Sequence, residues 1–296
     1  MRVGIFGSEY QVERQELIKR LFGKLRALGA EIYVDSPFCT FLADAFNYEP
    51  EMSGLLAGDE FDLDLALSVG GDGTFLRTAA RVNKQDIPIL GINTGRLGFL
   101  ADVGERELEQ TLDEIHAGHY RVEERGLLRL RTEERAFRGY NYALNEIAVL
   151  KRDSSSMITI HTFLDDEYLT SYQADGLVIA TPTGSTAYSM SVNGPIIAPQ
   201  CGNVVLSPVA PHSLNVRPLV IPDTCQITLR VESRNRFFLI SLDGRSEIFP
   251  AGIELRICKA DYTTKVVKRD GHTFYQTLRA KLMWGADARM NAFHGR

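Results

Sequence analysis

One short stretch, SVGGDGTFLR at residues 68–77, combines residue types that could act on a phosphate group. It surrounds a single carboxylate, Asp72, with three glycines: Gly70, Gly71 and Gly73. An apolar run precedes the stretch and a helical pattern follows it. The glycines should therefore lie at a strand-to-helix turn, where free backbone N–H groups and a helix N-terminus attract anions. Glycine permits close approach of a ligand to the backbone, and Thr74 is expected to cap the helix.

Phosphate binding alone does not explain Asp72, because a carboxylate repels phosphate unless it binds a cation or removes a proton. Both tasks belong to phosphoryl transfer. The stretch is not a Walker A loop, since no Gly-Lys-Ser/Thr follows, and no Gly-x-Gly-x-x-Gly follows the first predicted strand. An ordinary Asp-Gly turn with a helix cap remains the alternative interpretation.

Three further segments carry polar or glycine-rich patterns: GINTGRLGFL (91–100), LNEIAVL (144–150) and ADGLVIATPTGSTAYSMSVNGP (174–195). The first follows another predicted strand, so its glycines should reach the carboxyl edge where open α/β sheets bind ligands. The second sets Asn145 beside Glu146, and the third gathers hydroxyl groups after an apolar strand. These groups could bind a sugar and a base, or they could be strand-edge residues and a solvated turn.

Apolar periodicity predicts the elements that position these residues. Strands are expected at 2–7, 31–35, 63–69 and 87–93, with helical patterns over 12–28, 75–82 and 105–118. Such alternation predicts an α/β domain with a parallel, doubly wound sheet. Short alternating strands from Tyr120 onward predict an antiparallel, all-β, sandwich-like second domain.

We therefore expect an α/β domain over residues 1–110 that carries the glycine loop, and a β-rich domain over 111–296 that ends in a helical tail. The tail should dock on the body of the protein or on a neighbouring subunit through five apolar side chains: Phe274, Tyr275, Leu278, Leu282 and Trp284.

Composition narrows the classes of partner. The chain has 296 residues, 44% of them hydrophobic, which indicates a globular protein of about two domains. Its 33 Lys and Arg against 38 Asp and Glu, a net charge of -5, do not suggest a nucleic-acid surface, so an anionic ligand must be held locally. Apolar runs are far shorter than the ~20 residues that span a bilayer, and the N-terminus lacks the apolar core of a signal peptide. We expect a cytoplasmic protein without nucleic-acid or membrane partners.

The four cysteines are scattered and form no Cys-x-x-Cys pattern, so neither a zinc site nor a disulfide framework is indicated.

Taken together, the segments resemble the bacterial NAD kinase family over nearly the whole chain. The motifs that carry the resemblance are GGDGT, NTGRLGFL, LNE, DGLVIATPTGSTAYS, PHSLNVRPLV and SLDGRSE. GGDGT is shared with diacylglycerol and sphingosine kinases and more loosely with phosphofructokinases, whereas TPTGSTAYS combined with LNE is much more specific. The resemblance implies transfer of phosphate from ATP to the adenosine-ribose 2′-hydroxyl of NAD, with a divalent cation, expected to be magnesium, and no assigned metal-ligating residue. It also implies a homo-oligomer, a dimer or tetramer, that binds small-molecule nucleotides.

The same resemblance implies roles for individual residues. Asp72 would be the general base, Arg77 would meet phosphate charge and Phe99 would pack on the adenine region. Asn145 and Glu146 would hold adenosine and its ribose. The other residues of the implied nucleotide site are Gly71, Gly73, Thr74, Asp175, Thr186, Ala187, Tyr188, Ser189, Met190, Ser191 and Arg245.

Two other functions are compatible with part of this pattern. A lipid kinase of the diacylglycerol type could use the same GGDGT loop, but such enzymes usually carry an Asn-Glu pair soon after it, where this chain continues FLRTAARV. The chain also lacks an evident basic amphipathic segment for membrane docking. A non-catalytic dinucleotide-binding regulator would be expected to lose the proton acceptor, whereas Asp72 is present.

Overall fold

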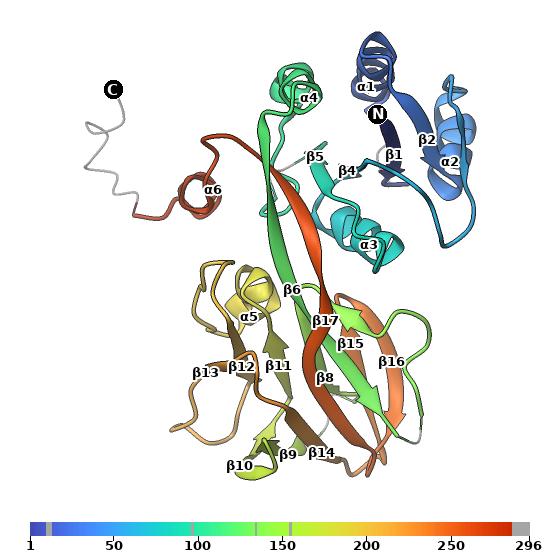
Figure 1. Cartoon of the computed structure of the whole chain (residues 1–296). Helices are drawn as coiled ribbons and strands as arrows, with labels where there is room; N and C mark the ends of the chain where they lie inside the picture. Colours follow the sequence, from blue (N-terminus) through green and yellow to red (C-terminus); the bar gives the residue numbers. More distant parts are fainter. Residues whose placement is uncertain (10–13, 96–97, 134, 154–155, 286–296) are drawn as a thin grey trace. The chain divides into compact units, whose positions relative to one another are not determined.

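The computed structural model describes residues 1–9, 14–95, 98–133, 135–153 and 156–285. Contacts group these residues into two compact units, Met1–Glu123 together with the segment from Lys265 onward, and Glu124–Thr264. Both divisions fall inside long strands, β6 (Tyr120–Thr132) and β17 (Glu254–Arg269) (Figure 1). The prediction divided the chain at 110/111 and kept the tail with the second domain. The contacts instead return the tail helix α6 (Phe274–Leu282) to the first unit.

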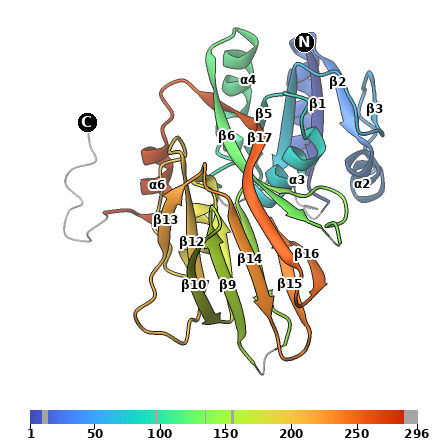
Figure 2. The same ribbon diagram turned by 60° about the horizontal axis from the view of Figure 1, so that its bottom comes forward.

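The first unit is an α/β unit, as predicted. Its strands are β1 (Arg2–Gly7), β2 (Glu31–Asp35), β3 (Gly54–Leu56), β4 (Leu65–Gly70) and β5 (Ile89–Asn93). Its other helices are α1 (Gln15–Ala27), α2 (Ser36–Phe46), α3 (Asp72–Val82), η1 (Glu105–Glu107) and α4 (Leu108–His116). The strands pair in parallel in the order β3-β2-β1-β4-β5, and the end of β17 continues the sheet beside β5. Helix α3 contacts β1, β4 and β5, and α1 contacts α4 (Figure 2).

Burial explains why these segments form these elements. All six residues of β4 are buried, as expected for a strand covered on both faces. Helix α1 buries the predicted apolar stripe of Leu17, Leu21 and Leu25. Helix α2 was not predicted, although Phe38, Leu42 and Phe46 recur every four residues and all three are buried.

The second unit is antiparallel and all-β, as predicted. Its remaining strands are β7 (Tyr142–Ala143), β8 (Glu146–Lys151), β9 (Ile158–Leu164), β10 (Glu167–Ala174), β11 (Gly176–Ala180), β12 (Asn203–Val209), β13 (Leu219–Pro222), β14 (Ile227–Glu232), β15 (Phe237–Leu242) and β16 (Arg245–Pro250). Two short helices, η2 (Thr183–Thr186) and α5 (Tyr188–Ser191), follow β11. One sheet has the order β13-β12-β11-β8-β15-β16. In the other, β10-β9-β14-β17, strand β17 also pairs with β6.

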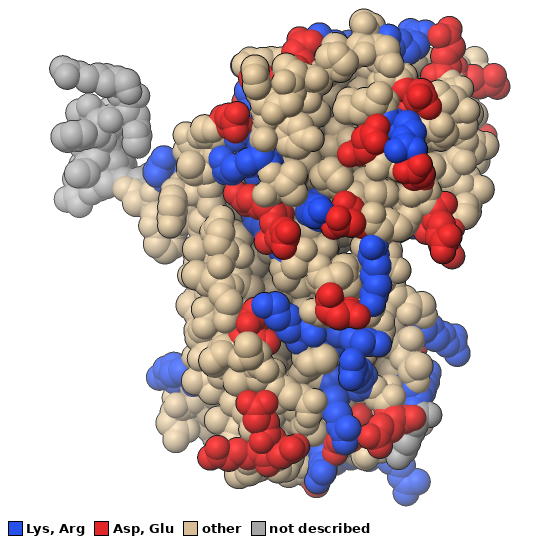
Figure 3. All heavy atoms as spheres, in the orientation of Figure 1, with Lys and Arg blue, Asp and Glu red and all other residues tan. Residues whose placement is uncertain are grey.

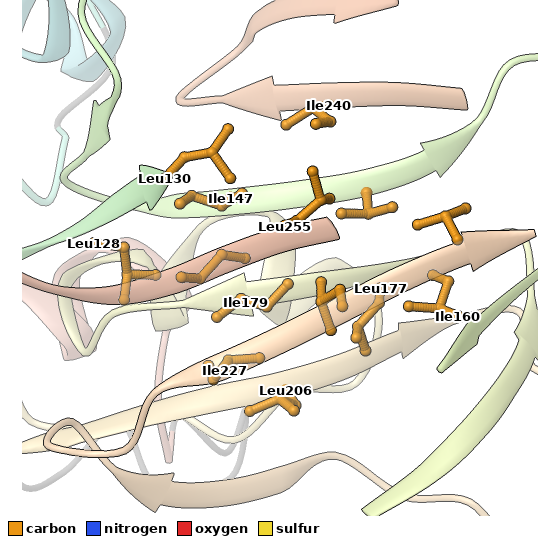
Figure 4. Close-up of a cluster of buried hydrophobic side chains, with 14 of the residues drawn as sticks. Leu128, Leu130, Ile147, Ile160, Leu177, Ile179, Leu206, Ile227, Ile240 and Leu255 are labelled. Atoms are coloured by element: carbon orange, nitrogen blue, oxygen red, sulfur yellow. The ribbon is translucent and has the colours of Figure 1, made fainter. Parts of the chain in front are cut away.

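The core of the second unit is built from side chains of both sheets (Figure 4). Ile147 on β8 and Ile179 on β11 are paired directly across these two neighbouring strands of one sheet. They share the cluster with Leu255, on β17 of the other sheet. All three side chains are fully buried. The packed sheets thus form the scaffold that carries the LNE segment at the start of β8.

On the face drawn in Figure 3, basic and acidic side chains lie beside one another in each unit. The ion pairs of the first unit include Arg20–Glu109, at 2.8 Å. Exposed pairs of this kind contribute about 0–1 kcal/mol each. Among the residues described, no helix combines the length and apolar character needed to cross a membrane.

Candidate active site

The glycine loop lies where the parallel sheet of the first unit reverses its winding direction. The chain proceeds outward from β1 through β2 and β3 on one side, and from β4 to β5 on the other. In open α/β sheets the carboxyl ends of the strands at such a switch point form the ligand crevice. The loop follows Gly70 at the carboxyl end of β4, so its position is that of a ligand-binding loop.

The loop's backbone differs in one respect from the expected turn. Gly71 is the N-cap and α3 begins at Asp72, so the prediction that Thr74 caps the helix is wrong. Thr74 lies in the first turn, is buried, and accepts a hydrogen bond from Arg77 at 3.3 Å. A Cβ on Gly70 would lie 2.3 Å from Oγ1 of Thr74, which explains a glycine there. Gly73 is exposed and Arg77 is exposed on the next turn.

Asp72 is bound to the turn that follows β5. Its Oδ2 accepts the backbone N–H of Phe99 at 2.9 Å, and its Oδ1 accepts those of Leu100 at 3.1 Å and Ala101 at 3.0 Å. A Cβ at Gly98 would lie 1.8 Å from Oδ1, so only glycine fits there without movement. Asp72 therefore has a structural role, which the interpretation as a pure proton acceptor did not include.

Asn93 closes the same turn from the end of β5. Its side chain donates to the carbonyl of Ala101 at 3.1 Å and accepts the N–H of Gly95 at 2.7 Å. Asn93 of the NTG motif therefore holds this turn with its side-chain amide. The backbone N–H groups of the turn then orient the Asp72 carboxylate.

The second neighbour of Asp72 comes from the far end of the sequence. Nζ of Lys281, on α6, lies 3.7 Å from Oδ2 of Asp72 and 4.8 Å from the centre of the Phe99 ring. Phe274, also on α6, contacts the same ring with centroids 6.2 Å apart. Sequence reasoning found the anchoring aromatic residue but missed Lys281, because a lysine near a chain end carries no motif.

In the second unit, a buried aspartate holds the LNE segment. Asp243 lies in the turn between β15 and β16, and its oxygens accept the N–H groups of Leu144 at 2.7 Å, Asn145 at 2.8 Å and Glu146 at 3.1 Å. Asp243 and Gly244 both have positive φ, 48° and 82°, as a two-residue hairpin turn requires. Burial raises the pKa of Asp243, against the effect of these three donors. Sequence reasoning used the SLDGRSE motif but did not assign Asp243 to the site.

Asn145 and Glu146 each keep a buried polar atom without a partner. Neither Oδ1 of Asn145 nor Oε2 of Glu146 accepts a hydrogen bond. Burial, together with the charge of Asp243, raises the pKa of Glu146 to about 7, although the backbone N–H of Tyr188 opposes the shift. Buried polar groups in proteins are normally paired. Unpaired acceptors on two consecutive residues therefore indicate a place for a polar ligand.

The TPTGSTAYS segment packs directly on this pair. Thr181 donates its backbone N–H to the carbonyl oxygen of Asn145 at 2.9 Å. Its hydroxyl donates to the carbonyl oxygen of Leu144 at 2.6 Å. Its Oγ1 also accepts the N–H of Gly184 at 3.1 Å. A Cβ at Gly184 would lie 2.0 Å from the Asn145 carbonyl oxygen, so the glycine permits this contact. The two motifs therefore form one structure.

The other predicted residues of the second unit fall into two groups. Tyr188 is half-buried, and burial raises its pKa with smaller effects from Glu146 and Asp175. Thr186, Ala187 and Met190 are also half-buried and Ser191 is exposed, so these side chains can meet a ligand. The carboxylate of Asp175 forms an ion pair with Lys151 at 2.7 Å.

Two predicted residues have evident structural partners. Ser189 is fully buried and its hydroxyl shares a hydrogen bond of 3.0 Å with that of Ser207. Arg245 donates to the backbone carbonyls of Tyr140 and Tyr142, the latter at 2.7 Å, and its guanidinium lies 5.0 Å from the Tyr140 ring centre. Burial lowers the pKa of Arg245.

Comparison with known proteins identifies the family of the chain that carries these two sites. The ATP-NAD kinase N-terminal domain matches residues 3–120, and the ATP-NAD kinase C-terminal domain matches residues 144–269. The chain belongs to the NAD kinase family. The Asp72 loop lies in the part matched by the N-terminal domain, and Asn145 and Glu146 lie in the part matched by the C-terminal domain.

Relatives named NAD kinase align with this chain over 99–100% of their own length. The chain is 53% identical over 290 residues to one from Bacteroides fragilis and 51% identical over 292 residues to one from Cytophaga hutchinsonii, each covering 98% of this chain and 100% of the relative. It is 46% identical over 288 residues to one from Porphyromonas gingivalis, with 97% of this chain and 99% of the relative covered.

Solved structures of the NAD kinase family share the fold. Yeast NADH kinase complexed with NADH superimposes with a TM-score of 0.87 at 23% identity, over 98% of this chain and 89% of that chain. An NAD kinase from Archaeoglobus fulgidus in complex with ATP gives 0.76 at 26% identity, over 96% and 99%.

Proposed function

We propose that this chain is an NAD kinase, which transfers the γ-phosphate of ATP to the 2′-hydroxyl of the adenosine ribose of NAD and so forms NADP. The chain's family and its relatives support this function, and one structural observation supports it most directly. Asn145 and Glu146, consecutive residues at a strand start that Asp243 fixes, each keep an unpaired, buried acceptor atom.

In this proposal, Asn145 and Glu146 recognise the adenosine half of NAD. Oε2 of Glu146 accepts a hydrogen bond from a ribose hydroxyl, and Oδ1 of Asn145 accepts one from adenosine. Hydrogen bonds to a charged acceptor contribute about 1.5–3 kcal/mol each. Tyr188 and the half-buried side chains of Thr186, Ala187 and Met190 line the site of the same ligand.

Asp72 is the proposed proton acceptor. As the ribose oxygen forms its bond to the γ-phosphorus, the bond from that phosphorus to the bridging oxygen of ADP breaks, and the hydroxyl proton passes to Asp72. Oδ2 carries one backbone N–H donor where Oδ1 carries two, so Oδ2 is the oxygen with room for the proton. Gly71, Gly73, Thr74 and Arg77 surround the phosphate chain at the start of α3.

The magnesium ion is assigned to the substrate. Among the described residues, no three His, Cys, Asp or Glu side chains come together in a way that would hold a metal ion. Magnesium commonly binds substrate phosphates and keeps several waters, and MgATP is the form in which we expect the donor to bind.

Two further properties are proposed: a cytoplasmic location, expected from the short apolar runs, and a homo-oligomer, either dimer or tetramer, implied by the family resemblance. Edge strands of the second unit, such as β16, offer unpaired backbone groups that a second subunit can cover. Sedimentation at micromolar concentration should give a species heavier than the 33.1 kDa chain, and a fully active monomer would contradict the oligomer.

The test of function uses the purified chain with MgATP and NAD, and measures NADP with an NADP-specific dehydrogenase. We expect NADP with NAD as acceptor and no phosphorylation of diacylglycerol. Asn145→Ala and Glu146→Ala should raise the KM for NAD about tenfold or more while the KM for ATP changes little, because each removes one ligand acceptor. Binding of NAD without turnover would instead identify a regulator.

A further inference from the structure

Helix α6 presents one face to the Asp72 turn. Phe274, Leu278 and Lys281 follow one another at spacings of four and three residues, so they share a side of the helix. Leu278 is buried, whereas Arg279, one residue further on, is exposed. The face that carries Lys281 is therefore the packed face.

The start of α6 is fixed to the same turn. Thr273 and Gln276 form a capping box, and His272, just before it, places Nδ1 3.3 Å from Oδ2 of Asp102. Asp102 directly follows Ala101, whose N–H binds Asp72, and it is buried with Lys268 at 2.5 Å. The chain is thus held just before the N-cap of α6, and the helix is held along its packed face, so the position of Lys281 is set by the fold.

The ammonium group of Lys281 lies beside the oxygen of Asp72 that has room for a proton. Its distance of 3.7 Å to Oδ2 allows electrostatic attraction but exceeds that of a hydrogen bond. Nζ of Lys281 lies over the Phe99 ring, which Phe274 contacts in turn, and the lysine side chain keeps 26% of its surface exposed. The group is therefore held in place yet reachable by a ligand.

We propose that Lys281 is a substrate-contacting residue whose ammonium group binds the phosphoryl group in transfer. This inference rests on the proposed function. A hydroxyl that gives its proton to Asp72 must lie about 2.6–3.2 Å from Oδ2, and the same hydroxyl oxygen forms the new bond to phosphorus. A cation 3.7 Å from Oδ2 therefore lies within about 7 Å of that hydroxyl oxygen, a separation that a change of lysine rotamer can close.

The chemistry of phosphoryl transfer suits a lysine at this point. The transferred group carries its charge on oxygens that cations such as lysine stabilise, and a flexible four-carbon stem lets the ammonium turn from Asp72 to the phosphate. In this view the ion pair with Asp72 holds Lys281 in place until the anionic substrate arrives.

The experiment compares Lys281→Met and Lys281→Arg with the wild type and with Arg279→Met. Methionine keeps the apolar stem against Phe99 and removes the charge, while Arg279 is a matched basic residue on the exposed side of the same helix. For Lys281→Met we expect kcat/KM for ATP to fall about 10- to 1000-fold, with the KM for NAD within about twofold of the wild type. Lys281→Arg should recover part of the loss, and Arg279→Met should match the wild type.

A binding measurement separates substrate contact from a structural role. Lys281→Met should bind a non-hydrolysable ATP analogue more weakly in calorimetry while its melting temperature stays close to that of the wild type. An Lys281→Met enzyme with unchanged kinetics, or with higher activity, would overturn the proposal, the latter because it would make the ion pair an inhibitory contact. Should Lys281→Met unfold, full activity of a folded Lys281→Gln would overturn it equally. A wild-type chain that forms no NADP would instead refute the proposed function.

Discussion

The Asp243 carboxylate accepts the backbone N–H of Glu146 at 3.1 Å while its charge opposes ionisation of the Glu146 side chain. The aspartate thus fixes the position of the residue and also makes it less acidic. With burial as the larger cause, the pKa of Glu146 rises to about 7. The carboxylate that we propose to bind the ribose therefore changes its protonation state near neutral pH, which is unusual for glutamate.

Glu146→Gln should change how stability depends on pH. The pKa of Glu146 is raised in the folded chain to about 7 from an ordinary 4.5, so folding favours the protonated form. The wild type then loses stability as pH rises from about 4.5 through 7, whereas glutamine does not titrate. Between pH 5 and pH 8 we expect Glu146→Gln to gain about 2–3 kcal/mol relative to the wild type, measured by urea unfolding. A constant difference across that range would show that the pKa is not raised.

Asp243→Asn should weaken both the fold and NAD recognition. Asparagine replaces one acceptor oxygen by an NH₂ group, which faces backbone donors and cannot accept from them. A buried donor left unpaired costs about 1–3 kcal/mol, so thermal unfolding should occur at lower temperature. The KM for NAD should rise more than that for ATP. Equal rises in the two KM values would argue against a specific link from Asp243 to the LNE segment.

Asp72→Asn should lower kcat by roughly 10²–10⁴, the scale of losing a general base. The melting temperature should fall as well, because the new amide nitrogen must face at least one of the three backbone N–H groups that the carboxylate accepts. The kcat must therefore be assayed well below that temperature. A folded variant with more than about a tenth of the wild-type kcat would contradict the role of general base.

Gly98→Ala should displace the Asp72 carboxylate while the aspartate itself is kept. The new Cβ would lie 1.8 Å from Oδ1 of Asp72, so the carboxylate or the turn must move, and kcat should fall at least tenfold. Gly23→Ala is the matched control, since its Cβ meets nothing within 4 Å and it lies inside α1. That control should keep its activity and gain about 0.5–1 kcal/mol of stability. Wild-type kinetics for Gly98→Ala would show that the position of Asp72 does not matter.

Local sequence patterns were sufficient for the two kinds of architecture. Apolar alternation in the second half and helical spacing in the first depend only on neighbours a few residues apart. The short apolar runs of the first half are equally local, and from them β1 and β2 were predicted with the bounds that the structure has. Helix α2 was missed, although the same kind of spacing is present in Phe38, Leu42 and Phe46. The motifs GGDGT and LNE likewise drew attention to Asp72, Asn145 and Glu146 from residue types alone.

Contacts between distant segments were decided only by the tertiary structure. Lys281 is 209 positions after Asp72, and Asp243 is 97 positions after Glu146, so no periodicity links either pair. The pairings arise because α6 packs on the turn after β5 and because the β15–β16 turn reaches the start of β8. The raised pKa of Glu146 has the same origin, since burial and a neighbouring charge exist only once the chain has folded. The sequence thus determined which side chains could do chemistry, and the packing decided which charges surround them.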